Sequence, residues 1–161
     1  MDKRPTAIDV AEHLMEIHGK LRSMTLHKAT FYCQAYSLAW VEQPLFDDEI
    51  IASVTGPHIP ALATELRRVR ELRRSPESQR EDLYTEGELD ADTSRLNGLQ
   101  RALIESISTQ LNMDWGYSLG LRSMRPGEVW ERFFIDTDVV HDRVITHQAM
   151  RRVYAEPHRS R

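Results

Sequence analysis

The order of apolar and polar residues along the chain is mostly that of helices. One apolar face recurs at helical spacing near the N-terminus, at Ile8, Ala11, Leu14, Met15 and His18. Thr6 and Asp9 resemble a capping box, in which two side chains satisfy the free amides at a helix start. Gly19 follows and can end the helix. The sequence therefore predicts a first helix between Thr6 and Gly19.

The segment from Thr25 to Val41 is apolar on nearly all sides. Its apolar positions are Leu26, Ala29, Phe31, Tyr32, Cys33, Ala35, Tyr36, Leu38, Ala39 and Trp40. A helix of this kind is expected to be enclosed by neighbouring elements, because it has no polar face to turn toward water. Thr25 is the expected N-cap, and the helix should end before Pro44.

A strand and a third helix are expected next. Residues 50–54 form a short β-prone run between turn formers, which predicts a strand. Gly56-Pro57 should turn the chain, and Pro60 suits the first turn of a helix, where its missing N–H is not needed. The apolar seam of this third helix is expected at Leu62, Leu66, Val69 and either Leu72 or Arg73.

Residues 75–92 are polar and acidic, with little apolar periodicity. We interpret them as a mobile loop or a partly helical insertion, since a long structureless loop is uncommon inside a compact domain. A fourth helix is expected from Thr93 to Leu111, capped by Asp92 or Thr93. Its apolar stripe would consist of Leu96, Leu99, Leu103, Ile107 and Leu111.

Several short elements are expected in the last third of the chain. A helix is predicted near residues 117–124, ended by Pro126-Gly127, and an apolar helical turn at residues 129–134. Residues 143–145 are a candidate second strand, and Thr146 should cap a last helix that runs through Tyr154. Residues 156–161 are expected to form a flexible tail.

These patterns predict one mainly α domain over residues 1–161. We expect a helical bundle around a buried central helix, with a small two- or three-stranded β element. Apolar residues make up 40% of the 161 residues and charged residues 29%, an ordinary balance for a globular domain. A chain of this length can bury a core without metal or disulfide support.

Composition and charge narrow the range of functions. No apolar run approaches the length of a spanning helix, and the N-terminus lacks the apolar core of a signal peptide. Cys33 is the single cysteine and is expected to be a small buried hydrophobic residue. These features favour a cytoplasmic protein without membrane contact, in a reducing environment.

The net charge of −4 argues against nucleic-acid binding, which usually requires a basic face. One arginine cluster leaves the alternative of a DNA-binding regulator open. It consists of Arg67, Arg68, Arg70, Arg73, Arg74 and Arg80. An acidic tract follows directly, so a solvated helix face is the other interpretation of the cluster.

No constellation with a catalytic or metal-binding pattern is evident in the sequence. The seven histidines include the pairs His13/His18 and His141/His147, and neither has the spacing of a zinc site. Asp47-Asp48-Glu49 could bind a cation, but further oxygen ligands at fixed spacing are missing, so a solvated turn is expected. The sequence predicts no enzyme, no cofactor and no metal.

Phe46 is ambiguous, because it lies between a proline turn and the acidic pair Asp47-Asp48. It could be an exposed anchor that docks, together with the acids, on a basic partner. It could equally be a buried plug that fixes the turn to the helices. Both interpretations remain open from the sequence.

The order of motifs between residues 25 and 62 resembles the Panacea domain, a SocA-like, phage-associated antitoxin family. The family's usual pattern reads Leu-x-Lys-Leu-Leu-Tyr-Tyr-Ala-Gln-Ala-Trp, then Pro-Leu-Phe-Asp/Glu, then Tyr-Gly-Pro-Val-Val-Pro. The matching residues are Leu26, Lys28, Tyr32, Gln34, Ala35, Pro44, Leu45, Phe46, Gly56, Pro57 and Pro60.

The resemblance extends over nearly the whole chain, with residues 75–92 the least comparable. Trp130 is similar to the tryptophan of the family's Pro-Trp step, and residues 144–154 resemble its terminal strand and helix. The chain departs from the pattern at Ala29-Thr30, where Leu-Leu is usual, and at Thr55, where an aromatic residue precedes Gly-Pro. Such changes could alter which partner is recognised.

The resemblance implies an antitoxin, encoded on a prophage or mobile element, that neutralises a cognate toxin by direct protein contact. The partner-binding residues expected on this basis are Phe46, Asp47, Asp48, Gly56, Pro57, His58, Pro60, Arg125 and Trp130. An adaptor that delivers a client to a protease, with residues 75–92 or the C-terminal tail as a handle, is an alternative. Self-association stays open.

Overall fold

The computed structural model describes residues 4–111, 116–134 and 143–155. The helices are α1 (Ala7–His18), α2 (Ser23–Val41), α3 (Pro60–Glu71), α4 (Pro76–Arg80), α5 (Gly98–Gln110), α6 (Gly116–Ser123), α7 (Val129–Phe133) and α8 (His147–Ala155). The strands are β1 (Ile51–Ser53), β2 (Gly56–His58) and β3 (Arg143–Val144). This mainly helical architecture with one small sheet confirms the predicted fold class. The predicted tail and His141 lie outside the described residues.

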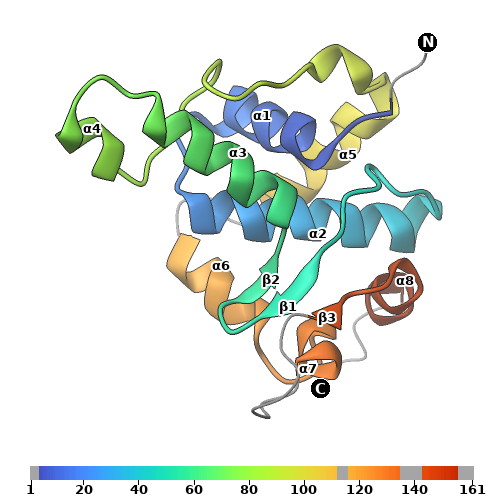
Figure 1. Cartoon of the computed structure of the whole chain (residues 1–161). Coiled ribbons are helices and arrows are strands. Elements are labelled where there is room, and N and C mark those ends of the chain that lie inside the picture. The colour runs from blue at the N-terminus through green and yellow to red at the C-terminus, as the bar shows by residue number, and fades with distance from the viewer. Residues whose placement is uncertain (1–3, 112–115, 135–142, 156–161) are drawn as a thin grey trace.

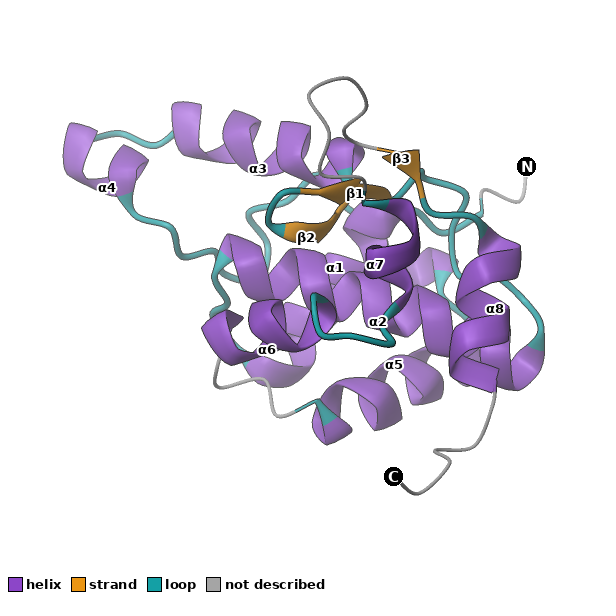
Figure 2. Ribbon diagram, turned by 90° about the horizontal axis from the view of Figure 1, so that it is seen from below, coloured by secondary structure: helices purple, strands orange, loops and turns teal. Residues whose placement is uncertain are grey.

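Helix α2 runs through the middle of the molecule, with α1, α5, α6 and α8 packed around it (Figures 1 and 2). Phe31, Tyr32 and Cys33 have no exposed surface, so the predicted enclosure of this helix is confirmed. The expected N-cap is wrong. The cap is Arg22, three residues earlier, and Thr25 is buried inside the helix. The Asp82 carboxylate accepts from the amide and hydroxyl of Ser23, the first residue of the helix, and so stabilises the earlier start.

The first helix has the cap that the sequence predicts. Thr6 Oγ1 accepts from the Asp9 amide, and Asp9 Oδ2 accepts from the Thr6 amide at 2.9 Å. The Asp48 carboxylate adds a third acceptor at this end, 2.8 Å from the Ala7 amide. Negative charge at a helix start is favourable because it satisfies free amides and opposes the helix dipole. Gly19 follows as the C-cap.

The sheet is antiparallel, with strand order β2-β1-β3. Ile51 pairs with His58 on one side and with Val144 on the other, so the predicted strand near residue 144 does join the first strand. The turn differs from expectation. It lies at Val54-Thr55, and Gly56-Pro57 belongs to β2. Pro57 is tolerated there because β2 lies at the sheet edge, where an amide donor is not required.

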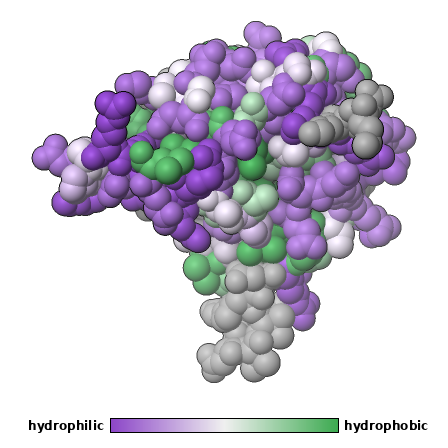
Figure 3. Space-filling model, turned by 45° about the horizontal axis from the view of Figure 1, so that its top comes forward, coloured by the Kyte–Doolittle hydropathy of each residue, from purple (hydrophilic) through white to green (hydrophobic). Residues whose placement is uncertain are grey.

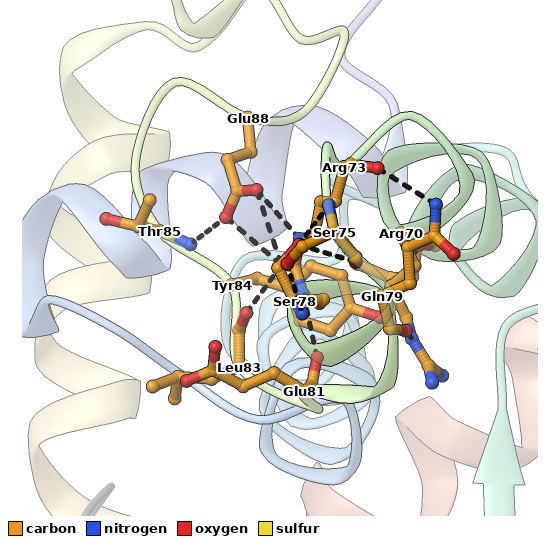
Figure 4. Close-up of polar contacts among 11 residues, drawn as sticks. Arg70, Arg73, Ser75, Ser78, Gln79, Glu81, Leu83, Tyr84, Thr85 and Glu88 are labelled. Carbon is orange, nitrogen blue, oxygen red and sulfur yellow. Dashed lines mark hydrogen bonds and ion pairs between the residues drawn. The ribbon is translucent and has the colours of Figure 1, made fainter.

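Pro60 begins α3 as predicted, and Leu62, Leu66 and Val69 are buried along its seam. Leu72 is 70% exposed and does not extend that seam. The next residue, Arg73, is the one that contacts the rest of the molecule. Its guanidinium lies 4.9 Å from the ring centre of Tyr84 and holds the following segment, as Figure 4 shows.

Residues 75–92 have a defined path that begins with α4, which confirms the partly helical interpretation. The Arg73 guanidinium donates to three backbone carbonyls of this segment, on Ser78, Glu81 and Leu83, at 2.6–2.9 Å. It also pairs with Glu88 at 3.3 Å (Figure 4). One side chain therefore organises a segment that contains little apolar surface of its own.

The second half of this segment is tied to the body by carboxylates from other helices. Asp9 and Glu12 of α1 accept from the amides of Asp92 and Gly87, and Glu65 of α3 accepts from the amide of Asp90. Leu21 and Tyr84 form an isolated antiparallel bridge. Backbone amides that leave water need acceptors, and the body supplies them.

The fourth predicted helix starts later than expected. Asp92 caps a 3₁₀ turn at Thr93–Arg95, and α5 begins at Gly98 after a capping box of Asn97 and Gln100. Leu99 is therefore in the first turn and is 60% exposed. Leu96, Ile107 and Leu111 of the expected stripe are buried, and Leu103 packs against the core. Ile104 and Ser108 complete the buried face in place of Leu99. The short elements α6, α7, β3 and α8 lie where the sequence places them, and Thr146 Oγ1 accepts from the Ala149 amide at the start of α8.

Candidate functional site

The residues that carry the sequence motifs meet around the middle of α2. The Lys28 amine donates to the Pro57 carbonyl at 2.7 Å, and the neighbouring His27 Nδ1 accepts from the Ile59 amide at 3.1 Å. Both side chains are buried. Two residues of α2 therefore hold the β2 strand and the turn into α3, and each bond crosses about thirty positions of sequence.

Burial determines the charges of this pair. Desolvation, with His58 and Lys28 nearby, lowers the pKa of His27 to about 3, so the ring is neutral and can accept a hydrogen bond. Its ring stacks on His58 with centres 4.5 Å apart. Burial also lowers the pKa of Lys28 to about 8. Burying this amine for one hydrogen bond to a carbonyl costs free energy, because burial disfavours its charged form.

Gln34 holds the Pro44-Leu45-Phe46 turn in the same way. Its Oε1 accepts from the Leu45 amide at 2.7 Å, and its Nε2 donates to the Phe46 carbonyl at 2.7 Å. Phe46 is only 2% exposed. The exposed-anchor interpretation of Phe46 is therefore wrong, and the buried-plug interpretation is confirmed. The sequence could not separate them, because the burial of Phe46 depends on a glutamine eleven or twelve positions earlier.

Gly56 is buried at the closest approach of the hairpin to the helices. Its φ is +103°, and a Cβ built there would lie 2.9 Å from Ser123 Oγ and 3.2 Å from Lys28 Nζ. A side chain at this position would be strained and would also clash. Gly56 and Pro57 are therefore part of the interior, and neither can form a direct partner contact, contrary to the expectation from the sequence.

The acidic pair is divided between two roles. Asp48 caps α1, as described above, whereas Asp47 is exposed and forms a surface ion pair with Arg4 at 3.2 Å. Surface pairs of this kind contribute little to stability because water screens them. Of the two acids, Asp47 is the one that remains accessible.

Trp130 lies against the hairpin from the other side. Its Nε1 donates to the Ser53 carbonyl at 2.7 Å, and its ring stacks on Phe134 with centres 4.6 Å apart. The ring is half-buried, and Arg125 in the preceding turn is exposed. Trp130 therefore fixes the edge of the hairpin and still presents part of its surface.

A cluster around Glu128 was missed from the sequence. Tyr32 donates to Glu128 Oε1 at 2.9 Å, and the Tyr154 hydroxyl donates to the other oxygen. Burial, with the carboxylate nearby, raises the pKa of both tyrosines, so both hydroxyls stay protonated. The Arg122 guanidinium lies 5.4 Å from the ring centre of Tyr32. Glu128 therefore joins α2, α8 and the start of α7.

Only spacing within α2 hinted at this cluster. Tyr32, Tyr36 and Trp40 recur every four residues, and their rings follow one another at 6.0 and 4.9 Å. Nothing in the sequence around Glu128 marks it as their partner, since it is nearly a hundred positions away. The exposure of this aromatic row increases along α2, from the buried Tyr32 to Trp40, which is 48% exposed.

The predicted partner-binding residues therefore separate into three groups. Asp47, Pro60 and Arg125 are exposed; Asp48, His58 and Trp130 are half-buried; Phe46, Gly56 and Pro57 are buried. Val54, the most exposed large hydrophobic residue of this region at 67%, was not among them. Figure 3 shows one face of the molecule, which is mostly hydrophilic with small separate hydrophobic patches.

Three of the six arginines of the cluster are bonded within the chain. Arg68 forms a two-point pair with Glu65 at 2.7 Å, Arg73 holds residues 78–88, and Arg70 donates to the Gln79 carbonyl. Arg67, Arg74 and Arg80 are exposed. This distribution matches a solvated helix face that nearby acids partly neutralise.

No group of three or more His, Cys, Asp or Glu side chains in residues 4–111, 116–134 and 143–155 could hold a metal ion. Within the same residues, every helix is too short or too polar to cross a membrane. Cys33 is fully buried, and burial raises its thiol pKa, so the thiol is protonated.

Comparisons of the chain with family models, with curated proteins and with solved structures found no match.

Proposed function

We propose that this chain is an antitoxin that neutralises a protein toxin by direct contact, and that it acts in the cytoplasm. The proposal starts from the resemblance of its motifs to the Panacea family. One observation supports it beyond the sequence. The residues that match the three separate motifs bond to one another, Lys28 to Pro57 and Gln34 to Leu45 and Phe46.

Motif residues that interlock in this way define a scaffold. The interior is then common to different members of such a family, while the surface selects the partner. Neutralisation would follow from occlusion: a preformed helical body covers the surface that the toxin needs. Binding would be favourable because little of this body has to become ordered on contact.

Co-expression with the neighbouring gene tests the proposal. That gene is expected to stop growth when induced alone, and growth is expected to return when this chain is produced with it. Co-purification of the two chains shows direct contact. The toxin level, followed after synthesis is blocked, separates occlusion, which leaves the level unchanged, from delivery to a protease, which lowers it.

A variant with a damaged interior is the control. Gln34→Ala removes the acceptor for the Leu45 amide and the donor for the Phe46 carbonyl, and should lose rescue together with folding. A neighbouring gene product that is harmless alone, or that still kills beside the wild-type chain without binding it, would refute the antitoxin proposal.

A further inference from the structure

The tip of the β1–β2 hairpin is the most exposed apolar point of the sheet region. Val54 is 67% exposed, and the adjoining Thr55 is exposed as well. The tip lies between two helical segments. Helix α6 contacts β2 on one side, and α7 contacts β1 on the other, through Trp130.

This tip is held in one shape. Ser53 Oγ donates to the Gly56 carbonyl at 2.8 Å and accepts from the Thr55 amide at 3.3 Å, which closes the turn from within. Trp130 fixes the Ser53 carbonyl. A rigid surface loses little conformational entropy when it binds, so a single exposed valine on it can act as an anchor.

The segments beside the tip are basic at their surface. Arg125 follows α6, Arg132 lies in α7, and Arg143 lies in β3, where it pairs with Ala52 of β1. All three are exposed, and none of their side chains has an ion pair or hydrogen bond to another described residue.

The carboxylates of the same segments are engaged within the chain. Glu128 accepts from Tyr32 and Tyr154, and Glu131 accepts from the Gly127 amide at 2.9 Å. Both carboxylates keep their negative charge, because hydroxyl and amide donors do not neutralise it. Among the described residues near the tip, the three arginines outnumber these two carboxylates.

We infer that Val54, Thr55, Arg125, Arg132 and Arg143, the hairpin-tip surface, contact the partner, and that the partner presents acidic residues around an apolar socket. This rests on the proposed function, since the partner is the toxin. Val54 would fill the socket, and the arginines would pair with the surrounding carboxylates. Complementary charge of this kind speeds association and selects the partner.

Binding of the purified neighbouring gene product to the full chain tests this surface. Val54→Asp removes the anchor, and the double variant Arg125→Glu/Arg143→Glu reverses the charge of the rim. Each should weaken binding by about 10-fold or more. Wild-type affinity should also fall as salt is raised, whereas the affinity of the double variant should be unchanged or rise, because salt screens its repulsion from the acidic partner.

Two matched variants just after the C-terminal end of α3 are the controls. Leu72→Asp changes a leucine that is 70% exposed, and Arg74→Glu reverses an exposed arginine. Both should bind within about 3-fold of wild type, because they lie outside the contact. Circular dichroism and thermal unfolding of every variant would show that folding is retained.

The outcomes distinguish the two proposals. If wild type binds the toxin and Val54→Asp and the double variant bind equally well, the hairpin-tip surface is wrong and the antitoxin function stands. Loss of binding in Leu72→Asp alone would likewise move the contact to α3. If wild type neither binds nor rescues, both proposals fail together.

Discussion

At the scale of single residues, Gly56 is the position where the smallest change should have the largest effect. Gly56→Ala combines a strained φ of +103° with a Cβ only 2.9 Å from Ser123 Oγ. Strain and overpacking each cost about 1–3 kcal/mol, so we expect about 3–5 kcal/mol loss in the free energy of unfolding. Gly127→Ala is the matched control, with φ +91° and open space around its Cβ, and should lose only about 1–2 kcal/mol. Equal losses in urea titrations would contradict the clash.

At the scale of elements, residues 75–92 depend on one side chain from α3. Arg73→Ala removes three bonds to carbonyls and the pair with Glu88. We expect local stability to fall by about 2 kcal/mol, which speeds amide exchange about 30-fold at Tyr84, Gly87 and Asp90. Amides of α2 should keep their protection. Arg74→Ala, exposed and adjacent, should leave all of these rates unchanged. Hydrogen exchange by mass spectrometry or NMR measures these rates. Unchanged rates in Arg73→Ala would show that the carboxylates of Asp9, Glu12 and Glu65 are enough to hold residues 75–92 in place.

The sequence predicted those helix starts that depend on residues close together in the chain. Thr6 with Asp9, and Thr146, mark helix starts through hydrogen bonds within four residues. Pro60 marks one through its fixed φ and missing N–H, and all three starts are confirmed. The errors occur where a distant partner decides. The hairpin turn is displaced from Gly56-Pro57 because Lys28 and Trp130 hold the two strands, and Phe46 is buried because Gln34 bonds its backbone. Glu128 had no local signal at all.

For the molecule as a whole, pH should act through the buried centre of α2, where Lys28 and Cys33 have opposite effects. Burial lowers the pKa of Lys28 to about 8 from 10.5, so its contribution to stability is present above pH 10.5 and lost as pH falls through 8. Burial raises the thiol pKa of Cys33, so its contribution is present below the unfolded value of 9.0 and declines above it.

Lys28→Met isolates the amine. From pH 7.5 to 9.5, the unfolding free energy of wild type should rise by about 2 kcal/mol relative to Lys28→Met, since one pKa unit corresponds to about 1.4 kcal/mol. Cys33 is present in both proteins and cancels. Urea titrations at several pH values measure the difference. A constant difference would mean that the Lys28 amine is solvated in the folded protein. The bond to Pro57 could then not hold the hairpin as described.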